Sequence, residues 1–452
     1  MTPPSRWPSW IVAVVLAAVA SLVLPNVAFA AGGGGGDGST LVVVALIAVV
    51  AVTYLLTHFV VERLQKIFLV LAGVEYIVLG VLLGPQMPYR IPAFSNLQDL
   101  MPIVALAVGW VGLLRGMELS VRRMRGQAPT GISRVVVVQA LVAGGMTALP
   151  AWYGFTQGWF FTFGGAAGQV GAQEVWMAAG LLGCAAVAGS SEPVELLRSR
   201  YRLEGELGER IRRLAASSDL LAIAVFGLLF CIFHENHENA IVQPSPTEWA
   251  VITILLGALL GVLFTPFLGE ADTDNGRFLA MVGIIVLASG AAYFLDLSPL
   301  LVNLCLGAVL VNTARAGPAI RKTLERTRRP MALVLLVFAG ALARPVDPVD
   351  ATIVTLAYIA LRMMGKAIGT GLAGWRSPLR GDYFRGLLAH GEVTVAMAVS
   401  LRLVYEGPAV DLAYCAILFS VFFNDLIAPR VLRGLFVDTG DLRGERSEEV
   451  SV

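Results

Sequence analysis

A succession of about thirteen apolar segments constrains this chain more than any other feature. Each is close to the roughly 20 residues that an α-helix needs to cross the hydrocarbon core of a bilayer. Backbone polar groups find no water there, so the segments must be helical. They cover approximately residues 41–61, 66–84, 98–118, 134–154, 175–198, 211–233, 248–268, 277–295, 298–314, 330–345, 351–374, 384–404 and 410–432. The sequence therefore predicts an all-α polytopic membrane protein.

Composition excludes several other classes. With 57% hydrophobic and 14% charged residues, the chain has too little polar surface to cover a soluble globule of 452 residues. We therefore expect the lipid bilayer as its surroundings and no nucleic acid as a partner. The four cysteines form no Cys-x-x-Cys pair, so neither a disulfide framework nor a zinc site is indicated. No cofactor is expected.

Lys and Arg gather in every second loop. Loops 155–173 and 234–248 contain neither residue. The basic loops hold Arg63, Lys66, Arg122, Arg123, Arg125, Arg134, Arg198, Arg200, Arg202, Arg210, Arg212, Arg213, Arg321, Lys322, Arg326, Arg328, Arg329, Arg376, Arg380 and Arg385. The positive-inside rule places these loops in the cytoplasm. The sequence therefore predicts a plasma-membrane protein with its N-terminus outside the cell and a cytoplasmic tail over residues 437–452.

The N-terminus resembles a secretory signal. Arg6 precedes an apolar run, which is followed by the small-residue pattern Ala28-Phe29-Ala30. Residues 1–30 are therefore predicted to be a signal peptide or, alternatively, an extra span. Residues 31–40 would form a Gly-rich exported N-terminus, and residues 41–436 the transmembrane domain.

Two predicted spans are interrupted by polar residues. The fifth span stops at the sequence Gly-Ser-Ser-Glu-Pro of residues 189–193, and the twelfth carries His390-Gly391-Glu392. Such interruptions persist at membrane depth only where they are buried or line a wet cavity. Because the two spans are seven apart, an odd number, they run in opposite directions. This arrangement predicts inverted-topology repeats with two broken, crossed helices.

Ionisable side chains within the spans mark a candidate ion site. Asp219 lies in the sixth span, and Arg362 and Lys366 lie one turn apart in the eleventh. A partly desolvated carboxylate lets a proton and Na⁺ or K⁺ compete for the same oxygens. Cation ligands would be oxygens of Asp219, Ser190, Ser191 and Ser218. The basic residues would stabilise the charged carboxylate or a helix end when the cation is absent.

Each of these residues also has a structural interpretation. Asp219 could accept a hydrogen bond at a helix end, and Glu192 could cap a helix or pair with an arginine of the following loop. Arg362 and Lys366 could hold helices together or extend towards the interface. His390 could sense pH or simply pack.

Four short motifs resemble those of the monovalent cation/proton antiporter superfamily. They are GVLLGP at residues 80–85, GLLRGMEL at 112–119, LSPLLVNLCLGAVL at 297–310 and AHGEV at 389–393. Their order and spacing are most similar to the second branch of the superfamily, the sodium/proton exchanger domain. The resemblance covers residues from about 40 to 436. It implies a secondary antiporter that exchanges a monovalent cation for protons.

The resemblance also assigns roles to residues. Asp219 would bind the proton or the cation, Ser190 and its neighbours would line the crossed-helix site, and Arg362 is favoured as the basic residue. Ser218, Glu192 and His390 depart from the family pattern. One carboxylate instead of two adjacent ones favours electroneutral 1:1 exchange of Na⁺ or K⁺, with no further metal.

The architecture that the resemblance implies has two parts. A mobile core would comprise spans of about residues 134–233 and 351–432, and the remaining spans would form a scaffold that makes a homodimer. The altered motifs leave an alternative, a non-transporting membrane sensor or partner protein on the same fold. An enzyme is not expected, because no His or Cys cluster, nucleophile elbow or phosphate loop is present.

Overall fold

The computed structural model describes residues 73–84, 100–121, 132–161, 170–203, 205–234, 244–270, 274–314, 317–374 and 381–445. The predicted signal segment 1–30, the Gly-rich residues 31–40 and the predicted span 41–61 lie outside the described residues. The span predicted over 66–84 is described from residue 73 onwards.

Helices make up most of the described chain. They are α4 (Val74–Leu83), α5 (Met101–Gly116), α7 (Ile132–Thr156), η4 (Trp159–Phe161), α8 (Ala172–Val187), α9 (Glu192–Arg200), α10 (Leu207–Ile232), α11 (Pro246–Glu270), α12 (Asp274–Phe294), α13 (Pro299–Thr313), α14 (Gly317–Ala341), α15 (Pro348–Gly374), η5 (Gly381–Leu387), α16 (Glu392–Val404) and α17 (Pro408–Thr439). Two short strands, β1 (Tyr201–Leu203) and β2 (Leu442–Glu445), pair antiparallel. By length and composition, seven of the described helical segments can cross a membrane. The prediction of an all-α multi-pass membrane protein is confirmed.

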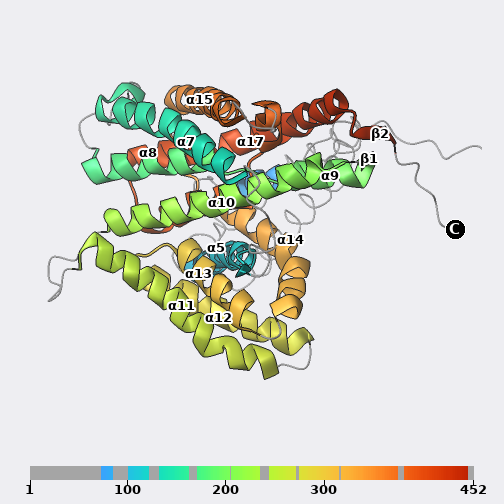
Figure 1. Cartoon of the computed structure of the whole chain (residues 1–452). Coiled ribbons are helices and arrows are strands. Elements are labelled where there is room, and N and C mark those ends of the chain that lie inside the picture. The colour runs from blue at the N-terminus through green and yellow to red at the C-terminus, as the bar shows by residue number, and fades with distance from the viewer. Residues whose placement is uncertain are drawn as a thin grey trace, which may run out of the picture.

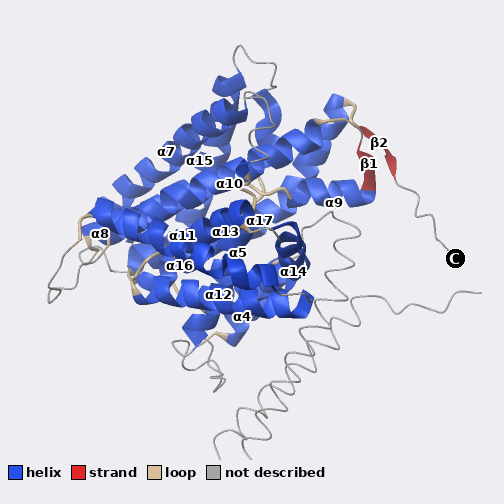
Figure 2. Ribbon diagram, turned by 60° about the horizontal axis from the view of Figure 1, so that its bottom comes forward, coloured by secondary structure: helices blue, strands red, loops and turns tan. Residues whose placement is uncertain are grey.

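The helices form two groups, one above the other in Figure 1. One contains α7, α8, α15 and α17, which pack on one another. The other contains α5 and α11 to α14, and α10 runs between the two. Helix α16 packs against α5 and α14 on one side and against α8 and α17 on the other. The β1–β2 ribbon projects at one end of the bundle, beyond α9 (Figure 2).

Glycines allow some of these helices to approach closely. A Cβ on Gly365 of α15 would lie 2.6 Å from the Cα of Ala143 in α7, and one on Gly307 of α13 would lie 2.5 Å from the carbonyl oxygen of Leu113 in α5. Membrane helices gain little from burying apolar surface against one another, so close backbone contact through small residues supplies their attraction.

Some predicted boundaries are wrong. Helix α14 begins at Gly317, whereas the span was predicted over 330–345, so Arg328 lies on a helix and not in a loop. The first half of α14 is too polar for a hydropathy criterion to detect, although its side chains pack on neighbours. Helix α17 continues to Thr439, beyond residue 432, at which the last apolar segment was predicted to end.

Candidate functional site

The two interrupted spans meet inside the bundle. Helix α8 ends at Val187 and α9 begins at Glu192, while η5 ends at Leu387 and α16 begins at Glu392. A Cβ on Gly391 would lie 3.2 Å from the Cβ of Ser190, so the two interruptions are in direct contact. A larger residue at position 391 would push them apart.

Arg362 and Lys366 of α15 satisfy the backbone carbonyls of both interruptions. Lys366 Nζ lies 2.7 Å from the carbonyl oxygen of Ala188 and 2.8 Å from that of Leu387. The Arg362 guanidinium donates to the carbonyls of Leu388 at 2.5 Å and Ala188 at 3.2 Å. Both side chains are fully buried. These carbonyls have no hydrogen-bond partner within their own helices and lie at the negative end of the helix dipole. The positively charged side chains of Arg362 and Lys366 are therefore stabilised here.

Acidic residues begin the second half of each broken helix. Glu192 is the first residue of α9, and Glu392 is the first of α16. Carboxylates at these positions are stabilised by the positive end of the helix dipole. Arg328 of α14 joins them, with Nε 3.0 Å from Glu392 Oε1 and Nη2 3.2 Å from Glu192 Oε1. Glu192 thus pairs with an arginine of α14, whereas the structural interpretation placed such a partner in the loop that follows Glu192.

Asp219 of α10 lies against the first interruption. Its side chain is 1% exposed, and its Oδ1 accepts a hydrogen bond of 3.1 Å from the backbone N–H of Gly189. Its Oδ2 lies 3.2 Å from Nη2 of Arg115, a residue of α5. The ionic partner of Asp219 is therefore Arg115, and the basic residues of α15 serve the helix ends instead.

Arg115 contacts two further carboxylates. Its guanidinium lies 3.2 Å from Glu118 Oε1 and 3.4 Å from Glu392 Oε1. The sequence did not single out Arg115 or Arg328. Arg115 is a charged residue within the apolar segment 98–118, and the criterion that selected Asp219 would also have selected it. Arg328 gives no such signal, because in the sequence it lies among the basic residues of a predicted loop.

The predicted hydroxyl ligands are dispersed around Asp219. Ser218 donates to the side-chain oxygen of Gln139 on α7 at 3.3 Å. The Ser190 hydroxyl accepts a 3.2 Å hydrogen bond from the backbone N–H of Glu192. Ser191 is half-buried, and its carbonyl accepts from the N–H of Val194 in the first turn of α9. Within the described residues, no hydrogen bond joins these hydroxyls to Asp219.

His390 lies among neutral polar groups. Its Nε2 is 2.9 Å from the hydroxyl of Ser420 on α17, and its Nδ1 is 3.3 Å from that of Thr394. Asn424 also donates to Ser420. The next residue, Asp425, is buried, and its Oδ1 has no hydrogen-bond partner among the described residues.

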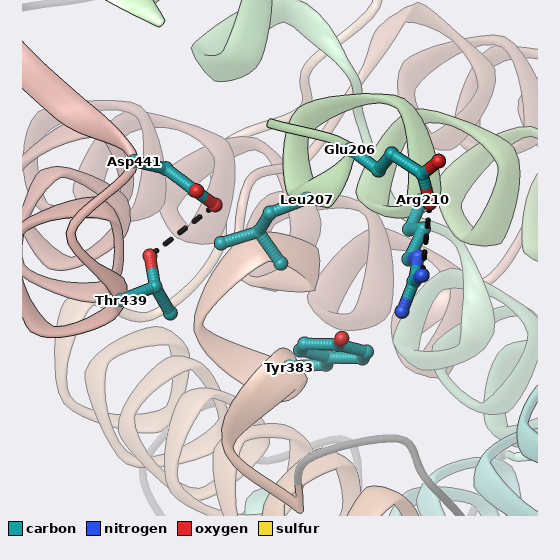
Figure 3. Close-up of a pocket in the computed structure, with 6 residues that line it drawn as sticks. All are labelled: Glu206, Leu207, Arg210, Tyr383, Thr439 and Asp441. Carbon is teal, nitrogen blue, oxygen red and sulfur yellow. Dashed lines mark hydrogen bonds and ion pairs between the residues drawn. The ribbon is translucent and has the colours of Figure 1, made fainter. Parts of the chain in front are cut away.

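A cavity of about 290 Å³ opens at another place on α10 than Asp219. It lies at the start of α10 and the end of α17, and is lined by Glu206, Leu207, Arg210, Tyr383, Thr439 and Asp441 (Figure 3). Arg210 precedes Asp219 by nine residues on α10, which is roughly 13 Å along a helix. None of the six lining residues is among the groups that contact Asp219.

Residues 73–434 match the family described as sodium/hydrogen exchanger, transmembrane. The chain belongs to the sodium/hydrogen exchanger family. This family consists of membrane transporters, and the resemblance read from the four motifs is confirmed. No curated protein matches the sequence.

Solved structures show the same fold. The structure of the sodium proton antiporter MjNhaP1 from Methanocaldococcus jannaschii at pH 8 has a TM-score of 0.58 and 14% identity, and the match covers 88% of this chain and 98% of that chain. A map of the same antiporter from electron microscopy gives a TM-score of 0.55 and 15% identity, covering 88% and 97%. The exchanger chain described here therefore shares its helical arrangement with a solved antiporter.

Proposed function

We propose that this exchanger-family protein is a secondary antiporter that exchanges Na⁺ or K⁺ for protons at Asp219. The observation that carries the proposal is a buried carboxylate at the junction of two interrupted helices, with a backbone N–H on one oxygen and a guanidinium on the other. The family match and the fold shared with a sodium proton antiporter support it.

One carboxylate is sufficient for the exchange of a cation for a proton. A proton and a monovalent cation cannot occupy the Asp219 oxygens together, so binding of one releases the other. Carboxylate, hydroxyl and carbonyl oxygens are the ligands that hard monovalent cations prefer, and Ser190, Ser191 and Ser218 lie close in the chain to the interruption or to Asp219. With one carboxylate at this position, the exchange is electroneutral, one cation for one proton.

The proposal includes an arrangement in the membrane. The group of α7 to α10 with α15 to α17 forms the mobile core, and the other helices form the scaffold of a homodimer. The protein lies in the plasma membrane with its basic loops in the cytoplasm. Glu192, Glu392 and the Arg362–Lys366 pair hold the ends of the broken helices while the core moves.

Proteoliposomes with a pre-set pH gradient test the proposal. We expect Na⁺ or K⁺ to dissipate the gradient with the wild-type protein, and Asp219→Asn to reduce the initial rate at least tenfold, because the amide neither binds and releases a proton nor carries a negative charge. The control is Glu209→Gln, on the same helix, whose carboxylate pairs with Arg212 and Arg213 at the surface. This control should retain the wild-type rate.

A non-transporting sensor is the second candidate function, and it would explain an absence of exchange in proteoliposomes. The ion pair on Asp219, and Ser218 at a position where the family has an acid or amide, favour a non-transporting sensor on the same fold. Folded wild-type protein that responds to neither Na⁺, K⁺ nor Li⁺ between about pH 6 and 9 would support that alternative and contradict the antiporter.

A further inference from the structure

Arg115 lies against the carboxylate at which the proposed antiport takes place. Its Nη2 lies 3.2 Å from Asp219 Oδ2, and its side chain is only 6% exposed, so little water screens the pair. We propose that Arg115 is a tethered counter-ion, which the transported cation displaces from Asp219, and that this displacement sets the KM for the cation. The inference rests on the proposed antiport function. It specifies what determines the cation concentration at which exchange reaches half its maximal rate.

The displaced guanidinium already has acceptors. Glu118 Oε1 and Glu392 Oε1 lie 3.2 and 3.4 Å from Arg115, so the side chain leaves Asp219 without becoming an unpaired buried charge. An unpaired buried charge would cost far more than the pair gains. Glu118 Oε2 is buried and has no hydrogen-bond partner among the described residues, so it can accept a further N–H.

The charges of the ion-pair network favour this exchange. Four carboxylates (Glu118, Asp219, Glu192 and Glu392) share the two guanidinium groups of Arg115 and Arg328. If all are ionised, the network carries two negative charges in excess. A cation that enters beside Asp219 reduces this excess while Arg115 remains within the network. Protons bound to the carboxylates reduce the same negative excess. A proton and a cation are therefore alternatives, as exchange requires.

The other buried cations do not compete for this role. Arg362 and Lys366 donate to the carbonyls at the ends of α8 and η5, and no ion pair among the described residues joins them to Asp219. Arg115 also belongs to α5, which packs mainly on α12, α13 and α14, whereas Asp219 belongs to α10. The Arg115–Asp219 pair therefore joins α5 to α10, the helix that runs between the two groups.

The test is the KM and maximal rate of cation-driven proton efflux in proteoliposomes at one alkaline pH. We expect Arg115→Gln to lower the KM at least fivefold, because the cation no longer displaces a charge. Arg115→Lys, which keeps the charge, should remain within threefold of wild type. Glu118→Gln should raise the KM at least threefold, because the displaced guanidinium loses a negatively charged acceptor. Glu209→Gln is the control and should leave the KM unchanged.

The results separate this inference from the function on which it rests. No exchange by the wild type would overturn both. Exchange by the wild type that Asp219→Asn abolishes, with a KM that Arg115→Gln leaves equal or raises, would overturn the tethered counter-ion alone. A purely structural arginine would lower the maximal rate without lowering the KM. If Arg115→Gln does not fold, Glu118→Gln decides, since an unchanged or lower KM in that variant contradicts the proposal.

Discussion

Two fully buried basic residues on one turn of α15 are held by backbone and not by acids. Lys366 and Arg362 donate to backbone carbonyls of both interruptions. The helix that follows each interruption begins with an acidic residue, Glu192 in α9 and Glu392 in α16. Opposite charges thus lie at opposite helix ends, as the direction of the helix dipole requires. A buried ammonium is tolerated because its N–H groups find oxygens within normal hydrogen-bond distance.

Lys366→Met tests this role. The substitution keeps most of the side-chain volume but leaves the carbonyls of Ala188 and Leu387 without their ammonium donor. Loss of hydrogen bonds from a charged group should cost about 1–3 kcal/mol, observed as a lower midpoint of thermal unfolding in detergent. Lys322→Met, at an exposed position on α14, is the control and should leave the midpoint unchanged. An equal midpoint for both variants would contradict the role.

Contact between α7 and α15 depends on glycines of α15. A Cβ on Gly365 would lie 2.6 Å from the Cα of Ala143, and a Cβ on Gly369 would lie 2.7 Å from the Cα of Gln139. The same helix carries Arg362 and Lys366, and α7 carries the Gln139 that accepts from Ser218. Spacing of these two helices therefore determines where the basic residues meet the interruptions.

Gly365→Ala should destabilise the protein. The methyl group would force α15 away from Ala143, and overpacking of this kind costs about 1–3 kcal/mol. Gly371→Ala is the matched control, because a Cβ at this position of the same helix meets no atom within 4 Å. This control should be neutral or slightly stabilising, since alanine favours helices over glycine. The measurement is the thermal midpoint, and similar midpoints would show that the helices adjust without cost.

At the scale of the whole molecule, α14 is tied to α16 at two levels. Arg328 pairs with Glu392 at the start of α16, and Arg344, beyond the end of α14, pairs with Glu406, just beyond the end of α16. The two helices therefore run side by side in the same direction. The pair at Glu392 is largely buried, whereas the Arg344–Glu406 pair is more exposed and contributes little to stability.

Orientation in the membrane can be checked with single cysteines in a background lacking the four native ones. Ser199 is exposed at the Arg-rich end of α9, and Ser245 is exposed at the start of α11, beside a loop without Lys or Arg. The positive-inside rule predicts that an impermeant maleimide labels Ser245→Cys in intact cells, and Ser199→Cys only after permeabilisation. The opposite pattern would invert the proposed topology.

The fold was predictable to the extent that it depends on local sequence. Apolar length identified the described spans, and the Gly/Ser/Pro run before α9 indicated the first interruption. Hydropathy missed the first half of α14, because its residues are polar although the segment is helical. The site was predictable in part: Asp219, Arg362 and Lys366 could be named as costly buried charges, but their partners could not.

By itself, the sequence determined that this chain is a multi-pass helical protein with two interrupted helices and a few charges at membrane depth, because the cost of placing each residue in lipid depends on that residue and its close neighbours. Only the tertiary structure decided that Arg115 pairs with Asp219 and Arg328 with Glu192 and Glu392. These partners lie on different helices, and ion pairing depends on which helices pack together and at what rotation about their axes.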